Sequence, residues 1–195
     1  MIMKKIIFWH LIAITFISTT LLAACGGGSD LDGGRTAGQG NGQGGGSDSS
    51  VATTTLSDEE VAGLLFMREE EELARDLYLD IYDVKESRLN TFKRISDNAE
   101  TKHAEAIRTL LETYGIDDPS TGLHNIYNDP DLQNLYDQLL NIAVGSDDLA
   151  ALRVGALVEE TDIRDINTYK SHVATDHQDI VSTYNNLLCG SRNHL

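Results

Sequence analysis

The chain has 195 residues, and its 31 acidic residues outnumber its 15 Lys and Arg, so its formal net charge at pH 7 is −16. Because the phosphates of nucleic acid repel such an acidic chain, nucleic acid is excluded as its main partner. The length fits one folded domain with additional segments, and two cysteines are too few for a four-cysteine metal site.

The N-terminal segment is predicted to lie outside the folded domain. Lys4 and Lys5 precede an apolar run over residues 6–24, which leads through small residues into Cys25. This arrangement resembles the lipobox of bacterial lipoproteins, which implies a signal peptide over residues 1–24 and a lipid-modified Cys25. An uncleaved membrane anchor is the alternative, because an apolar run of this length nearly spans a bilayer.

Residues 25–55 are rich in Gly and Ser, as a flexible tether would be. With a lipidated Cys25, this tether would hold the protein on a membrane of the cell envelope, facing the periplasm or the exterior. The remaining residues, 56–195, are numerous enough to bury a hydrophobic core without disulfide staples.

Residues 56–195 are predicted to be almost entirely helical, because no stretch alternates with a period of two. Ser57 and Glu60 form a capping box for a first helix that continues to about residue 84. Asp129 and Ser146 are predicted to cap two of the later helices. The later helices are expected at about 90–114, 130–145, 147–169 and from 176 towards the C-terminus.

This order of elements predicts an all-α fold. The architecture that we expect is a four-helix bundle with one long crossover between its second and third helices. The short helix at about 130–145 would lie inside that crossover.

Four consecutive glutamates, Glu69 to Glu72, lie within the first predicted helix. Successive helix residues are 100° apart, so the four side chains cannot all face the core. Glu71 shares the face of the apolar residues and is predicted to point inward. Glu69 and Glu72 are expected to be solvated. Helix geometry does not decide whether Glu70 points inward or outward.

Carboxylates and imidazoles recur on the later helices. Glu100 stands three residues before His103, a spacing at which both side chains of a bundle helix can reach one metal ion. On the next long helix, Glu159 is predicted to share an inward face with Leu152 and Ala156. A solvated acidic face with a histidine at the edge of the core is the alternative interpretation. The remaining domain histidines, expected at the surface, are His124, His172 and His177.

The sequence of residues 64–78, LLFMREEEELARDLY, resembles the first helix of ferritin-like di-iron proteins. Its spacing of Glu71, Ala74, Arg75 and Tyr78 is similar to that of rubrerythrins, whose second-helix Glu-x-x-His-Ala motif matches residues 100–104. Together with the later stretches GALVEETDI and GSRNHL, these motifs make the domain similar to a bacterial and archaeal ferritin-like family of unknown function.

This resemblance implies two metal ions, which would be Fe, with Mn or Zn as alternatives. Glu100 would bridge the ions, and Tyr78 would pack beside the site. Ser191 stands where a fourth-helix Glu is expected, and the spacing of Asp162 makes it a candidate substitute. The implied ligands are Glu71, Glu100, His103, Glu159, either Asp162 or Glu160, and His194.

The features together predict a membrane-tethered di-metal protein that oxidises Fe(II) or reduces O₂ or peroxide. Because the chain has no Cys-x-x-Cys motif, a reduction would require an external reductant. The alternative is a non-enzymatic metal-binding or interaction module on the cell envelope. The sequence assigns no catalytic residue and leaves the oligomeric state open, a homodimer included.

Overall fold

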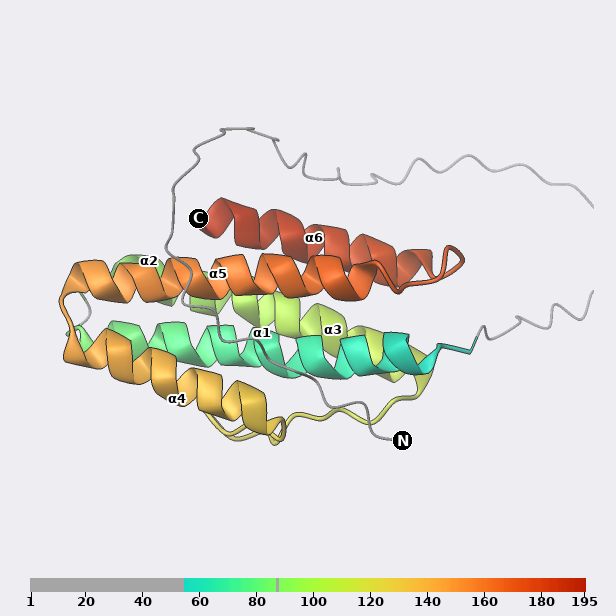
Figure 1. Cartoon of the computed structure of the whole chain (residues 1–195), viewed down its shortest axis with the longest axis horizontal. Coiled ribbons are helices and arrows are strands. Elements are labelled where there is room, and N and C mark those ends of the chain that lie inside the picture. The colour runs from blue at the N-terminus through green and yellow to red at the C-terminus, as the bar shows by residue number, and fades with distance from the viewer. Residues whose placement is uncertain (1–54, 87) are drawn as a thin grey trace, which may run out of the picture. The chain divides into compact units, whose positions relative to one another are not determined.

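The computed structural model describes residues 55–86 and 88–195, and every regular element within them is a helix (Figure 1). This part of the chain is therefore all-α, as predicted. The predicted signal peptide and Cys25 lie outside the described residues. The elements are α1 (Asp58–Val84), α2 (Asn90–Ile95), the π-helical turn η1 (Ser96–Glu100), α3 (Thr101–Tyr114), α4 (Pro130–Gly145), α5 (Asp148–Lys170) and α6 (Gln178–His194).

No helix within the described part of the chain is long and apolar enough to cross a membrane. The helices pack lengthwise against one another. α1 contacts α3, α4 and α5, while α6 contacts both α3 and α5. Figure 1 shows α4 along one side of α1 and α6 on the far side of α5.

The predicted helix starts are confirmed for α1 and α4 and wrong for α5. The Ser57 hydroxyl accepts from the Glu60 amide at 3.2 Å, and the Glu60 carboxylate accepts from the Ser57 amide at 2.7 Å. Asp129 caps α4. The N-cap of α5 is Asp147 rather than Ser146, because the Asp147 carboxylate accepts from the Ala150 amide.

The predicted second helix is interrupted by η1, where the Thr101 amide donates to the Ser96 carbonyl five residues earlier. The residues Phe92, Ser96, Glu100 and Ala104 are buried at four-residue intervals. Steps of four drift by about 40° on a regular α-helix. Since a π turn is wider, η1 takes up this drift and turns Glu100 into the interior.

The apolar core consists of two clusters of buried residues. One cluster includes Leu77 and joins the C-terminal half of α1 to α4 and the start of α5. The other includes Met67 and joins the N-terminal half of α1 to α3, α6 and the end of α5. Residues 69–72 of α1 lie between the part of this helix that belongs to one cluster and the part that belongs to the other. These residues therefore form a buried polar layer between the two clusters.

The predicted inward face of α5 is rotated in the structure. Leu152 is 42% exposed and Ala156 is also exposed, whereas Gly155 and Glu159 face the interior. A Cβ added at Gly155 would lie 2.6 Å from Cε1 of Phe92. The absence of a side chain at Gly155 therefore lets α5 approach α2 on this face, which a hydrophobic pattern alone does not reveal.

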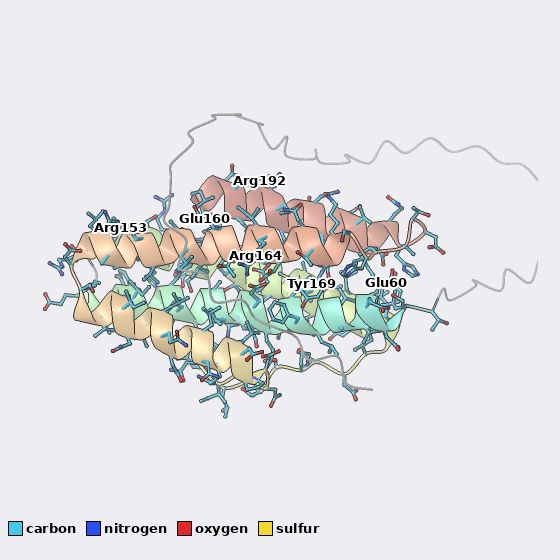
Figure 2. The ribbon with its side chains drawn as sticks, viewed as in Figure 1. Glu60, Arg153, Glu160, Arg164, Tyr169 and Arg192 are labelled. Atoms are coloured by element: carbon cyan, nitrogen blue, oxygen red, sulfur yellow. The ribbon has the colours of Figure 1, made fainter. Side chains whose placement is uncertain are left out.

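Glu60 ties the start of α1 to the loop between α5 and α6 (Figure 2). Its carboxylate accepts from the Ala174 amide at 2.9 Å and lies 2.5 Å from Nδ1 of His177. His177 is only 3% exposed, so the expectation of a surface histidine is wrong. Burial alone would raise the pKa of Glu60, but hydrogen bonds from Ala174, His177 and Ser57 outweigh it and lower this pKa to about 2.

The substitution Glu60→Ala is expected to lower the free energy of unfolding by about 2–3 kcal/mol at pH 7, because it removes a buried charged acceptor. The pKa of Glu60 is depressed from 4.5 to about 2 on folding. Its contribution is therefore complete above pH 4.5 and disappears as the pH falls towards 2. Urea unfolding at pH 7 and pH 3 tests this, with the exposed Glu59→Ala as the control. An equal loss at both pH values would contradict the assignment.

Candidate metal centre

All four glutamates of the acidic run are buried, so the prediction that Glu69 and Glu72 are solvated is wrong. The two oxygens of Glu69 accept from the backbone amides of Asn128 and Asp129, at 2.5 and 2.9 Å. Glu72 forms an ion pair with Arg68 at 2.9 Å. Residues before α4 thus cover a face of α1 that would be solvated on an isolated helix.

Glu71 points inward as predicted and is 1% exposed. Neither of its carboxylate oxygens accepts a hydrogen bond from any described residue. The neighbouring Glu70 is also buried, and its Oε2 likewise lacks a donor among the described residues. Two adjacent buried carboxyl groups thus contribute three oxygens that accept no hydrogen bond from the described part of the chain.

The first group of potential metal ligands consists of Glu71, Glu100 and His103. Nδ1 of His103 lies 3.1 Å from Oε2 of Glu100 and 3.3 Å from Oε2 of Glu71. Gly190 of α6 makes room for the imidazole, because an added Cβ there would lie 2.4 Å from Nε2 of His103. Three helical segments, α1, η1–α3 and α6, therefore position this group.

The second group consists of Glu100, Glu159 and His194. Nδ1 of His194 lies 3.0 Å from Oε1 of Glu100 and 3.1 Å from Oε1 of Glu159. Tyr78 from α1 donates its hydroxyl proton to Oε1 of Glu159 at 2.6 Å. Tyr78 therefore contacts one acid of this group.

Glu100 belongs to both groups, and its two oxygens are divided between them. Oε2 faces His103, whereas Oε1 faces His194. The two imidazole rings stack with their centroids 6.1 Å apart. The cluster thus has the form of two three-residue groups that share one carboxylate.

Asp162 and Glu160, the two alternatives on α5, lie in different surroundings. Asp162 is 4% exposed, and its Oδ2 accepts a hydrogen bond from the Ser191 hydroxyl, while Oδ1 has no donor among the described residues. Glu160 is exposed and belongs to neither ligand group (Figure 2). Of the two alternatives, the structure brings only Asp162 into the buried layer.

The carboxyl groups of the cluster differ in protonation. Burial, followed by the charge of Asp162, raises the pKa of Glu71 well above its usual value. Burial raises the pKa of Asp162 to about 7. Burial would also raise the pKa of Glu100, but hydrogen bonds from His103 and His194 outweigh it and lower this pKa to about 2. Glu100 is thus the acid of the cluster that stays ionised most readily.

The two histidines are held in their protonated forms. Burial would lower both pKa values, but contacts with Glu100 and Glu71 raise the pKa of His103 to about 11. Contacts with Glu100 and Glu159 raise the pKa of His194 to about 9. Protons therefore occupy the nitrogen atoms that a metal ion would bind.

The donor set fits a pair of metal ions. Buried carboxylates without partners are costly, and two oxygens of the cluster have neither a hydrogen bond nor an ion pair with a described residue: Oε1 of Glu71 and Oδ1 of Asp162. A divalent cation would satisfy them. Carboxylate oxygens together with imidazole nitrogens suit Fe, Mn or Zn.

One residue that shapes the cluster, Gly190, and one hydrogen bond were missed from the sequence. Gly190 was not singled out, although a small helix residue directly before Ser191 is a signal of close approach. The hydrogen bond from Ser191 to Asp162 has no sequence signal, because it joins α6 to α5 across 29 residues.

Comparisons with known proteins found a matching family, a relative and a similar solved structure. Residues 60–195 match the family described as "Uncharacterized protein domain (DUF2202)". The chain is 40% identical over 134 residues to "Uncharacterized protein MJ0754" of Methanocaldococcus jannaschii, covering 68% of this chain and 69% of that protein. The crystal structure of that hypothetical protein is similar, with a TM-score of 0.67 and 39% identity, covering 72% of this chain and 78% of the solved one.

The substitution Gly190→Ala is expected to lower the free energy of unfolding of the metal-free protein by about 1–3 kcal/mol, because the new Cβ displaces an imidazole held by two acids. Thermal or urea unfolding measures this. Gly145→Ala is the matched control, since a Cβ there meets nothing within 4 Å. The control should stay within about 1 kcal/mol of the natural sequence. Equal effects of the two substitutions would contradict the packing of His103.

Proposed function

The chain belongs to the family described as "Uncharacterized protein domain (DUF2202)", and we propose that it is a di-metal carboxylate protein, with iron as the favoured metal. The observation that carries the proposal is the division of the two Glu100 oxygens between two acid–histidine groups. A bridging carboxylate presents one oxygen to each of two ions in this way. Mn and Zn are the alternative metals.

We further propose a ferritin-like four-helix bundle as the architecture. Its four helices would be α1, the α2–η1–α3 segment, α5 and α6, with α4 inside the crossover. Contacts of α1 with α3 and α5, and of α6 with α3 and α5, support this assignment. Ligands from all four helices would then meet near the middle of the bundle.

The proposed ligands follow from the two groups of side chains. Glu71 and His103 would hold one ion, Glu159 and His194 the other, and Glu100 would bridge them. Asp162 lies in the same buried layer and is available as a further acid. Glu160 is not among the proposed ligands because its side chain is exposed.

Two iron ions in such a site would supply redox chemistry towards Fe(II), O₂ or peroxide. The chain contributes position and exclusion of water. Tyr78 holds Oε1 of Glu159 by a hydrogen bond, and burial raises the pKa of Tyr78, so the phenol keeps its proton as a donor. The apolar clusters cover the polar layer on both sides along the bundle. A redox cycle would draw on an external reductant.

Ser191 favours a second candidate function, metal binding without catalysis. It supplies a hydroxyl at the position where a fourth-helix carboxylate would be the stronger ligand, and this hydroxyl binds Asp162. A bundle with fewer free acids could buffer metal or present an interaction surface on the envelope. In both cases we propose that Cys25 carries the lipid anchor that holds the protein on the membrane.

Anaerobic loading of the full chain with Fe(II) is expected to give two ions per chain. Glu100→Ala should weaken binding of both ions by more than the 10–100-fold typical of losing an outer-shell partner, because it removes a shared ligand. Glu160→Ala is the matched control, an exposed acid of α5, and should bind as the natural protein does. The measurement is metal content per chain. Fewer than one ion per chain, unchanged by Glu71→Ala, would contradict a di-metal site.

Metal uptake at pH 7 is expected to release at least about two protons per chain. The pKa values of about 11 for His103 and about 9 for His194 lie above this pH, so both imidazoles are protonated before binding. Ligation requires their neutral forms. Calorimetry in two buffers of different ionisation enthalpy measures the release. His172→Gln, at an exposed histidine, should release the same number, and absence of any release would contradict ligation by the two histidines.

A further inference from the structure

A cavity of about 220 Å³ lies between α2 and α5 and reaches the second ligand group. Leu152 and Ala156 of α5 line it, and both are exposed, so the cavity opens to solvent there. Glu159 also lines it and is 3% exposed, which places this carboxylate at the inner end. The cavity therefore connects the surface to the proposed metal centre.

The walls of this cavity differ from its inner end. Phe92, Ile95, Leu152 and Ala156 supply apolar surface along the sides. At the inner end, the Tyr78 hydroxyl and Nδ1 of His194 both contact Oε1 of Glu159. An occupant would thus meet apolar side walls together with Thr91, and polar groups of Tyr78, Glu159 and His194 at the inner end.

The aromatic wall is held rigidly in place. The rings of Tyr78 and Phe92 stack with their centroids 5.2 Å apart. Phe92 fits against Gly155, where a Cβ would lie only 2.6 Å away. Since these contacts fix both rings from behind, the cavity is formed before any occupant enters.

We propose that this cavity is the substrate pocket of the metal centre and that it takes a small, uncharged, largely apolar molecule. The role as a substrate pocket rests on the proposed function, whereas the binding of such a molecule does not. The volume is below the range of about 300–1,000 Å³ typical of drug-sized ligands, which limits the occupant to a molecule near the size of benzene. A charged occupant is disfavoured because its charge would lose hydration against the apolar side walls of Phe92, Ile95 and Leu152.

Benzene is the probe for the test, and the protein is the metal-free full chain. Methyl NMR signals of Ile95 and Leu152 should shift on titration, with a dissociation constant on the order of 1 mM. Benzoate should bind at least tenfold more weakly because of its charge. Absence of shifts at these methyl groups would overturn the proposal, and equal binding of benzoate would overturn its restriction to uncharged molecules.

The variant Ala156→Phe fills the cavity at its mouth and should weaken benzene binding at least tenfold. Leu157→Phe is the matched control, because Leu157 is exposed on the same helix and does not line the cavity. Leu152→Trp narrows the same mouth and replaces Ala156→Phe if that variant does not fold. Benzene binding that neither mouth variant weakens would overturn the assignment.

A metal-dependent measurement separates this proposal from the proposed function. With Mn(II) bound, the relaxation of benzene protons should be strongly enhanced relative to the Zn(II) form, because the ions would lie at the inner end of the cavity. If Mn(II) binds and this enhancement is absent, the pocket is not the substrate pocket of the centre. If no metal binds, the proposed function fails, and the benzene titration of the metal-free chain still decides the binding site.

Discussion

Four carboxylates, those of Glu71, Glu100, Glu159 and Asp162, are buried at the level where the two apolar clusters of the core are separated. Such groups are stable in an interior only with partners that offset their loss of hydration. His103 and His194 are the partners that the chain itself provides. The two apolar clusters on either side of this layer supply the hydrophobic stabilisation of the fold, which the buried carboxylates do not provide.

The buried layer requires unusually close approach of backbone and rings. Gly190 leaves space for the imidazole of His103, and Gly155 leaves space for the ring of Phe92. The π turn η1 widens the helix so that Glu100 faces the same interior as the residues before it. These three features have a common effect, because each allows neighbouring helices or side chains to approach closely without adding bulk.

Acidic residues outside the two ligand groups have structural roles that stabilise the ends and the crossover. Glu60 fastens α1 to the loop before α6 through the Ala174 amide and His177. Glu69 accepts two amides immediately before α4. The four glutamates of the acidic run of α1 therefore have different roles. Its first residue holds the crossover, its last pairs with arginine, and Glu71 alone of the four belongs to a ligand group.

The sequence by itself determined the helices, the capping box of α1 and the inward direction of Glu71, because these depend on local spacing along one helix. It also identified Glu100, His103, Glu159 and His194 as potential ligands, which the structure brings together. The family match covers residues 60–195. Each of these predictions concerns the residues of one helix taken alone, so the local pattern along that helix is enough to make it.

Only the tertiary structure decided what covers each helix face. The burial of Glu69, the rotation of α5 and the burial of His177 all depend on contacts between segments far apart in the chain. The same is true of the hydrogen bond from Ser191 to Asp162, and of the two histidines that divide the Glu100 oxygens. Helical periodicity describes how a side chain leaves its own helix, and it holds no information on which neighbour that side chain meets.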